Sequence, residues 1–199
     1  KKLALAAAER FGGEIVSADS RKVYRYLDIG TAKPSPEDRE RVPHHLIDIV
    51  DPDEPFSAGE WVARASEAVS GILARGRLPV ISGGTGFYIA AFREGLTAGI
   101  DPDPDVRVRF EEELARDGAV RLHEKLAAVD PERAAELHPN DSFRVLRALE
   151  TYYATGMTFT NQRAATKITG GDYDWFTVGT VIPRDVLYAS IDARADDMI

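Results

Sequence analysis

The sequence contains no cysteine, no long apolar run and no excess of positive charge, and each absence narrows the possible functions. Without a cysteine among the 199 residues, disulfide bonds and thiolate metal sites are excluded. No apolar run approaches the ~20 residues that a membrane-spanning helix needs, so we expect no membrane partner. The 33 acidic residues outnumber the 25 basic ones and give a net charge of −8. Any RNA contact therefore has to come from a local basic patch.

Predicted strands alternate with predicted helices in the first half of the chain. Apolar runs at residues 14–18, 45–50 and 78–82 predict three buried strands. Helical patterns lie before and between them, at residues 1–11, 57–75 and 87–93. This alternation is typical of an open parallel α/β sheet.

The pattern changes in the second half. Residues 105–155 keep helical periodicity, which predicts three or four short helices and no strand. The polar stretch 156–171 predicts a mobile connector. Residues 175–182 return to strand character, and residues 184–199 predict an amphipathic helix. The helical stretch therefore interrupts an α/β core.

Two polar motifs follow predicted strands, at the edge where open α/β sheets bind ligands. Asp19 comes directly after the first strand, and a partly buried carboxylate there is a candidate base because burial raises its pKa. A cap for the next turn and a Mg²⁺ ligand are the alternatives. In the second motif, residues 83–86 (GGTG), glycines let a ligand approach the backbone and the next helix aims free N–H groups at an anion. An ordinary strand-to-helix turn has the same pattern.

Four arginines on predicted helices are candidates for contacts with phosphate. Arg144 and Arg147 are three residues apart and share one helix face. Together with Arg107 and Arg109 they could form the positive patch that RNA phosphates require. The alternative is that all four are solvated surface residues, offset by the acidic residues 111–113.

Arg194 lies on the last predicted helix and is a candidate for binding a pyrophosphate through its planar, bidentate guanidinium. Otherwise it is a surface residue beside Asp192 and Asp196. The four histidines do not have the spacing of a metal site, and we expect structural roles for them.

The motifs together, in order along nearly the whole chain, resemble the tRNA dimethylallyltransferase (tRNA isopentenyltransferase) family. DIGTAKP and HPND at this separation are specific, and the resemblance is carried by Gly12–Pro34, Pro43–Pro52, Pro79–Ile89 and Leu137–Glu150. It implies an α/β fold, with a P-loop NTPase-like parallel sheet core at residues 1–100 and 172–199. An all-helical insert domain at residues 101–171, which includes the connector, would bind tRNA. The implied reaction moves a dimethylallyl group from dimethylallyl pyrophosphate to the exocyclic amine of an adenosine next to the anticodon, with Mg²⁺ as cofactor.

The resemblance also implies roles for individual residues. Asp19 would be the catalytic base, Thr85 would lie near the reacting centre, and Arg194 would hold the pyrophosphate during catalysis. The implied contacts with tRNA are Asp19, Ser20, Arg21, Lys22, Thr85, Arg107, Phe143, Arg144 and Arg147. Lys22 stands where the family usually has glutamine, which bears on the amide contact at this position. No residue is assigned as a metal ligand.

The family's N-terminal strand and glycine-rich phosphate loop are missing before Lys1, and its C-terminal helices are missing after Ile199. We therefore expect a chain truncated at both ends and inactive without its phosphate loop. The expected partners are the anticodon stem-loop of tRNA and dimethylallyl pyrophosphate, bound by a cytoplasmic monomer. One alternative is a P-loop-type small-molecule kinase, because the order of strands and helices fits it as well. Another is an RNA-binding module without activity.

Overall fold

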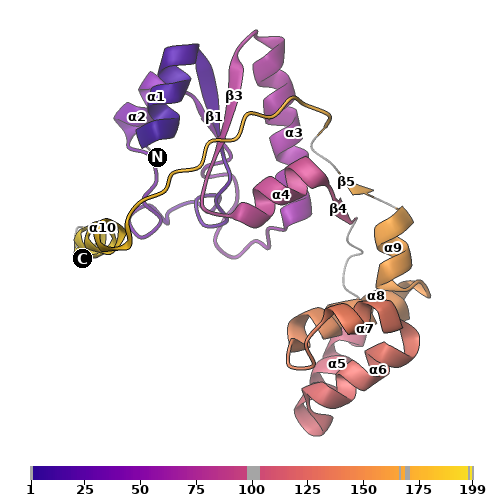
Figure 1. Ribbon diagram of the computed structural model, residues 1–199. Coiled ribbons are helices and arrows are strands. Elements are labelled where there is room, and N and C mark those ends of the chain that lie inside the picture. Colours follow the sequence, from indigo (N-terminus) through magenta and orange to yellow (C-terminus); the bar gives the residue numbers. More distant parts are fainter. Residues whose placement is uncertain (1, 98–103, 166, 169–170, 197, 199) are drawn as a thin grey trace. The chain divides into compact units, whose positions relative to one another are not determined.

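The chain folds into two compact units that are described separately below. The computed structural model describes residues 2–97, 104–165, 167–168, 171–196 and 198 (Figure 1). The α/β unit comprises Lys1–Glu94 and Thr169–Ile199, and the helical unit comprises Gly95–Ile168. The boundary expected between residues 100 and 101 lies outside the described residues. No helix among the described residues is long and apolar enough to cross a membrane.

A small parallel sheet forms the centre of the α/β unit. Its strands have the order β2-β1-β3. The central strand β1 (Gly13–Ser17) is buried at every residue and pairs along its whole length with β3 (Leu78–Ser82). The short strand β2 (His44–His45) pairs with the other edge of β1. The strands predicted at residues 14–18 and 78–82 are therefore confirmed, and so is the mixed α/β class.

Helices cover the sheet on both sides (Figure 1). On one face, Ala8 of α1 (Lys2–Phe11) packs against Ile15 of β1. On the other, α3 (Ala58–Ala74) places Trp61 so that its ring N–H donates to the carbonyl of Ser17, at 2.9 Å. A capping box between Ser57 and Glu60 starts α3, at the beginning of the helix predicted at residues 57–75. The remaining helices of this unit are α2 (Pro36–Arg41), α4 (Gly86–Glu94) and α10 (Arg184–Asp196).

The strand predicted at residues 45–50 is wrong beyond its first residue. Leu46 and Asp48 have φ angles of 64° and 58°, which a β-strand does not allow. The segment instead follows the loop after β1, where the N–H of Asp48 donates to the carbonyl of Lys22 at 3.1 Å. Tyr24 and Val50 form an isolated parallel bridge. The apolar pattern was satisfied by burial of this turn and not by a strand.

The strand predicted at residues 175–182 is also wrong. This segment has no regular secondary structure, and Phe176 and Val181 are almost fully exposed. A strand is stable only when another strand pairs with it, and none of the described residues pairs with this one. The helix that follows, α10, is confirmed, although every residue in it is exposed.

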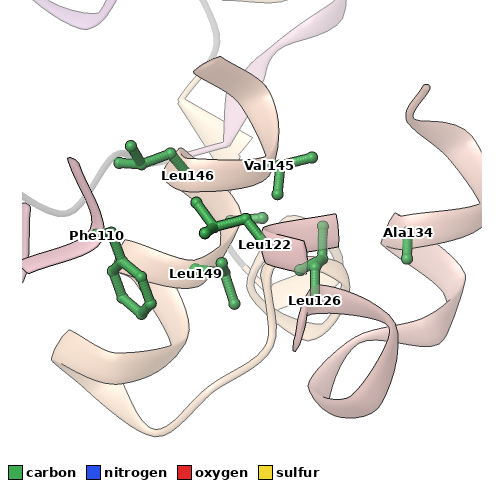
Figure 2. Packing of buried hydrophobic residues seen from close by; sticks show 8 residues of the cluster. Phe110, Leu122, Leu126, Ala134, Val145, Leu146 and Leu149 are labelled. Atoms are coloured by element: carbon green, nitrogen blue, oxygen red, sulfur yellow. The ribbon is translucent and has the colours of Figure 1, made fainter. Parts of the chain in front are cut away.

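The helical unit is built from five helices among the described residues. The sequence predicts three or four helices between residues 105 and 155, and the structure has four there: α5 (Pro104–Asp117), α6 (Ala119–Val129), α7 (Pro131–Glu136) and α8 (Ser142–Thr155). Figure 2 shows the core that they share: labelled side chains from α5, α6 and α8 lie close together, and Ala134 of α7 lies at the side of this group. Its buried members are Phe110, Leu122, Leu126, Ala134, Val145, Leu146, Ala148 and Leu149.

The mobile connector predicted at residues 156–171 is wrong over much of its length. Residues Phe159–Ala165 form a helix, α9, whose Phe159 packs against the core of the unit. Thr160 holds this helix in place, because its hydroxyl and its N–H both donate to the buried carboxylate of Asp130, at 2.7 and 3.0 Å. The two passages of the chain into and out of the unit pair as short antiparallel strands, β4 (Leu96–Thr97) and β5 (Lys167–Ile168).

Candidate active site

The two polar motifs predicted from the sequence meet at the carboxyl ends of β1 and β3. The N–H of Thr85 donates to the carbonyl of Ala18 at 3.0 Å, so the GGTG turn rests on the residue before Asp19. A Cβ atom at position 83 would lie 1.9 Å from the same carbonyl oxygen. Only glycine fits there, since this distance is far below van der Waals contact. The first glycine of the motif therefore serves close packing of the two turns.

The hydroxyl of Thr85 joins the GGTG turn to the loop after Asp19. It accepts a hydrogen bond from the N–H of Ser20 at 2.9 Å and donates to the hydroxyl of Ser20 at 3.2 Å. The two residues are 65 positions apart in the sequence. Asp19, Ser20 and Thr85 therefore lie together at this edge of the sheet, and these three residues are called the rim below.

The carboxylate of Asp19 is held by the two residues that follow it. One oxygen accepts from the N–H groups of Arg21 and Lys22, at 3.0 and 3.3 Å. The other lies 3.2 Å from the ammonium of Lys22, and 21% of the Asp19 side chain remains accessible. Burial raises the pKa of Asp19, but the N–H of Arg21 and the charge and hydrogen bonds of Lys22 outweigh it, so the pKa lies below its ordinary value. The raised pKa expected from the sequence is therefore wrong.

Tyr88 adjoins this rim, and no pattern in the sequence selects it. It lies in the first turn of α4, where its N–H donates to the carbonyl of Thr85 at 3.0 Å, and its ring stacks on Trp61 with 4.9 Å between centroids. Burial raises the pKa of the Tyr88 hydroxyl, and the neighbouring acidic groups, including Asp19, raise it further. Tyr88 is therefore a neutral phenol close to an ionised carboxylate.

A buried ammonium fixes the loop that continues from Lys22. Lys33 of the DIGTAKP motif donates to the carbonyl of Tyr24 and to carboxylate oxygens of Asp28 and Asp48, at 2.7, 2.7 and 2.5 Å. Arg39 binds the second oxygen of Asp48 at 2.8 Å. Burial raises the pKa of Asp48, but these two cations outweigh it and lower the pKa below its ordinary value. The DIGTAKP motif thus secures the loop that carries Ser20, Arg21 and Lys22.

The described residues do not fit a Mg²⁺ site at this rim. They include no cluster of three or more side chains of the types that bind metal ions. Both carboxylate oxygens of Asp19 already face hydrogen-bond donors, and a cation there would compete with the ammonium of Lys22. No catalytic step is therefore assigned to a metal ion bound by these residues.

The arginines predicted to contact RNA lie on α5 and α8 of the helical unit, and each is already paired with a carboxylate. Arg144 pairs with Asp141, which caps α8, and Arg147 pairs with Glu150. Arg107 pairs with Glu111 at 3.0 Å. Phe143 has an exposed side chain at the start of α8, with 72% of its surface accessible. An exposed aromatic ring beside guanidinium groups is typical of RNA-binding surfaces, but paired charges are equally typical of solvated helices.

Arg194 and the histidines stand apart from the Asp19 rim. Among the described residues no hydrogen bond or ion pair joins Arg194 to the rim, and all of α10 is exposed. The histidines have hydrogen-bonding partners typical of structural roles: His45 lies 2.7 Å from Glu14, and the ring of His123 contacts the carbonyls of Ala134 and Leu137.

Comparisons with known proteins agree in sequence and in structure. A sequence model described as IPP transferase matches residues 22–199. The tRNA dimethylallyltransferase of Syntrophobacter fumaroxidans is 46% identical over 196 residues, which are 98% of this chain and 57% of that protein. The crystal structure of the full-length tRNA isopentenylpyrophosphate transferase from Bacillus halodurans has a TM-score of 0.59 at 40% identity, over 99% of this chain and 61% of that one.

A eukaryotic dimethylallyltransferase, described in crystallographic snapshots as acting on tRNA, has a TM-score of 0.75 at 26% identity, over 99% of this chain and 49% of that one. The likeness to these solved structures confirms the predicted P-loop NTPase-like fold class. The chain spans 57% and 64% of the length of two of the curated relatives that it matches.

Proposed function

The chain belongs to the IPP transferase family, and from this membership we propose that the full-length protein is a tRNA dimethylallyltransferase. It would transfer a dimethylallyl group from dimethylallyl pyrophosphate to the exocyclic amine of an adenosine next to the anticodon. One structural observation supports this proposal above the others. The ionised carboxylate of Asp19 and the hydroxyls of Ser20 and Thr85 lie together at the carboxyl edge of a parallel sheet, where such folds bind their ligands.

The proposed reaction makes one bond and breaks one. The exocyclic nitrogen of the adenine, turned out of the anticodon-loop stack, attacks the first carbon of the dimethylallyl group. A nitrogen–carbon bond forms while the bond from that carbon to the pyrophosphate oxygen breaks, and pyrophosphate leaves with the bonding electrons. The nitrogen then carries an extra proton, which passes to the carboxylate of Asp19.

The lowered pKa of Asp19 is compatible with this role. The amine loses basicity by conjugation with the purine ring, so it becomes strongly acidic as the new bond forms. A proton acceptor with a low pKa is sufficient for such an acid, and a low pKa keeps the carboxylate ionised at neutral pH. Asp19 would therefore take the proton late, as the nitrogen gains positive charge.

The neighbouring side chains have supporting roles in the proposal. Ser20 and Thr85 would hold the adenine against Asp19, and Arg21, whose side chain is exposed, would contact the RNA backbone. Lys22 would keep the carboxylate oriented through its ammonium, 3.2 Å from one oxygen. Arg194 would bind the leaving pyrophosphate through its guanidinium, which requires α10 to approach the rim when the substrate binds.

The helical unit would bind the anticodon stem-loop through Arg107, Phe143, Arg144 and Arg147. Mg²⁺ would accompany the pyrophosphate and not the protein, because the rim has no free carboxylate for it. We further expect a cytoplasmic monomer. The kinase alternative finds no support among the relatives described above.

The test uses the full-length protein, dimethylallyl pyrophosphate labelled in its prenyl group, and an anticodon stem-loop RNA. Asp19→Asn keeps an oxygen that can accept from the N–H groups of Arg21 and Lys22 but removes the base. We expect turnover to fall about 10²- to 10⁴-fold, the usual contribution of a positioned general base, with little change in RNA affinity. Asp53→Asn, at an exposed position of the same unit, is the matched control.

Near-normal turnover of Asp19→Asn would remove Asp19 from the base role. Binding of the stem-loop without any prenyl transfer by the unaltered full-length protein would favour the inactive RNA-binding module instead.

A further inference from the structure

A buried carboxylate lies inside the helical unit, where no function has been assigned to it. Glu150 belongs to α8, and only 2% of its side chain is accessible to solvent. Its neighbours Leu146, Leu149 and Thr151 are buried as well. Removing a carboxylate from water has a high free-energy cost unless cations compensate it. The fold must therefore supply positive charge at this point.

Two arginines from different helices supply that charge. One oxygen of Glu150 accepts from Arg147, one turn earlier on α8, at 3.2 Å. The other oxygen lies 3.7 Å from Nε of Arg107, on α5. Within the described part of the chain this second oxygen has no hydrogen-bond partner, so its contact with Arg107 is electrostatic. A single buried carboxylate thus holds two guanidinium groups at one place.

Both arginines keep part of their surface in solvent. Their side chains are 39% (Arg107) and 32% (Arg147) accessible, while the carboxylate between them is covered. Two guanidinium groups in contact with one carboxylate would repel each other without the negative charge between them. Glu150 therefore allows the fold to present two cations side by side on its surface.

Stability alone is a poor explanation for this arrangement. A buried ion pair is often no more stabilising than well-packed apolar side chains of the same volume, because desolvation offsets the attraction. The core around Glu150 already consists of such side chains. The expense of burying a carboxylate is more readily explained by what it does to the two arginines.

We propose that Glu150 is a positioning residue for RNA binding, which holds Arg107 and Arg147 in a fixed pair that contacts adjacent phosphates of the tRNA backbone. This inference rests on the proposed function, since it adds a determinant of RNA affinity to the same enzyme. Glu150 itself touches no RNA, because it is covered.

RNA affinity could depend on the total charge of the surface or on the positions of its arginines. The two explanations predict opposite changes in affinity when Glu150 is neutralised. Glu150→Gln removes a negative charge next to the RNA surface, so charge counting predicts tighter binding. Positioning predicts weaker binding, because the two arginines lose the group that orders them. We expect the affinity of the full-length protein for the anticodon stem-loop to fall about tenfold. The slope of log affinity against log salt should fall by roughly 0.7–0.9, the value of one phosphate contact.

Two controls separate positioning from general effects. Glu111→Gln removes the exposed carboxylate that also pairs with Arg107, and should leave affinity unchanged or increase it. In a variant that already carries Arg107→Gln and Arg147→Gln, Glu150→Gln should have no further effect. For Glu150→Gln alone, KM for RNA should rise while kcat at saturating RNA stays unchanged, since the Asp19 rim is untouched.

Glu150→Met guards against a simple folding defect. A side chain of similar volume without charge should preserve the core, which hydrogen exchange of α5 and α8 would verify, and should still lose RNA affinity. Unchanged or increased affinity in the folded variants, or an unchanged salt slope, would overturn the positioning role. If the unaltered protein binds no anticodon stem-loop at all, the proposed function fails instead.

Discussion

The two units place their candidate functional groups by different means. In the α/β unit, backbone N–H groups and turns from distant parts of the sequence fix Asp19, Ser20 and Thr85. In the helical unit, a buried side chain orders Arg107 and Arg147 on the surface of a packed helical core. The geometry of the Asp19 rim depends on the turns that supply its backbone N–H groups. The geometry of the two arginines depends on one cluster of charged side chains. The two sites should therefore fail under different perturbations.

The cores of the units differ in how they hold their buried charged groups. The helical unit surrounds its centre with aliphatic and aromatic side chains (Figure 2). The α/β unit also buries large apolar residues such as Trp61 and Phe92, and among the described residues each unit buries two charged side chains. In the α/β unit, Lys33 lies 2.5 Å from Asp48 and Glu14 lies 2.8 Å from Arg75. In the helical unit, Asp130 accepts hydrogen bonds from the uncharged Thr160, and Glu150 lies 3.2 and 3.7 Å from its two arginines. The following predictions test whether this contrast is real.

The largest effect is expected from removing the aromatic centre of the helical unit. Phe110 is fully buried in the shared core, and Tyr153 packs edge-on against its ring with 5.2 Å between centroids. Phe110→Ala should lower the free energy of unfolding of this unit by about 3–5 kcal/mol, through lost burial and the cavity left behind. Hydrogen exchange measured peptide by peptide should show faster exchange in α5 and α8.

Exchange in β1 and β3 should not change in the same variant, because those strands belong to the other unit. Equal acceleration in both units would break the comparison, since it would mean that they unfold together. Val108→Ala, at an exposed position on α5, is the matched control and should have little effect.

The second effect concerns the ionic support of the α/β unit. Lys33→Met leaves Asp48 with Arg39 as its remaining cation and removes the hydrogen bond to the carbonyl of Tyr24. Breaking a buried ion pair from one side is costly, and we expect a loss of about 3 kcal/mol in the stability of this unit. Hydrogen exchange should accelerate first in the loop at residues 22–33.

Arg41→Met is the control for this variant. It removes a pair with Glu9 that is exposed on both sides, and should change stability by about 1 kcal/mol or less. Equal losses of stability in the two variants would mean that burial does not strengthen the ion pairs of Lys33. The contrast between the two cores would then be weaker.

Acidification should affect the α/β unit before the helical unit. Hydrogen bonds from Arg75 lower the pKa of Glu14 below its ordinary value of 4.5; burial opposes this, and contact with His45 lowers it further. The pKa of Asp48 is lowered as well. Groups with a lowered pKa stabilise the fold above their ordinary pKa, and this contribution is lost as pH falls through the lower, folded value. The α/β unit should thus lose stability progressively below pH 4.5.

Tryptophan fluorescence reports on this unit alone, because both tryptophans of the sequence, Trp61 and Trp175, belong to it. The helical unit has carboxylates with a lowered pKa too, at Asp117 and Asp141, but solvent screens these exposed pairs and their effect should be small. Hydrogen exchange in α5 and α8 reports on the helical unit, and a fluorescence transition at the same pH as faster exchange in these helices would contradict the expected order.

Elements whose stability is local could be predicted from the sequence. The helical patterns at residues 57–75 and 105–155 identified α3 and α5 to α8. The short, mostly apolar runs of β1 and β3 identified the central strands, and the motifs after them identified the rim. These signals lie within a few residues of the structure that they determine.

Elements that depend on a distant partner could not be predicted. The turn at Leu46 and Asp48 exists because Lys33 and Arg39 bind the Asp48 carboxylate, and nothing in the local pattern reveals that contact. In the same way, α9 is held by Asp130, about thirty residues earlier in the chain. The lowered pKa of Asp19 was missed because burial was considered without the donors that accompany it.

The short ladder between β4 and β5 joins the two ends of the helical unit, so the unit could be inserted or removed as one piece. Leu96 faces Ile168 and Thr97 faces Lys167, so the chain leaves and re-enters at neighbouring points. A two-residue turn can join two antiparallel strands. If such a turn replaced the helical unit, the α/β unit would carry a simple β-hairpin at this point, so an insertion here is tolerated. Gain, loss or exchange of the helical unit in evolution would thus need no rearrangement of the sheet.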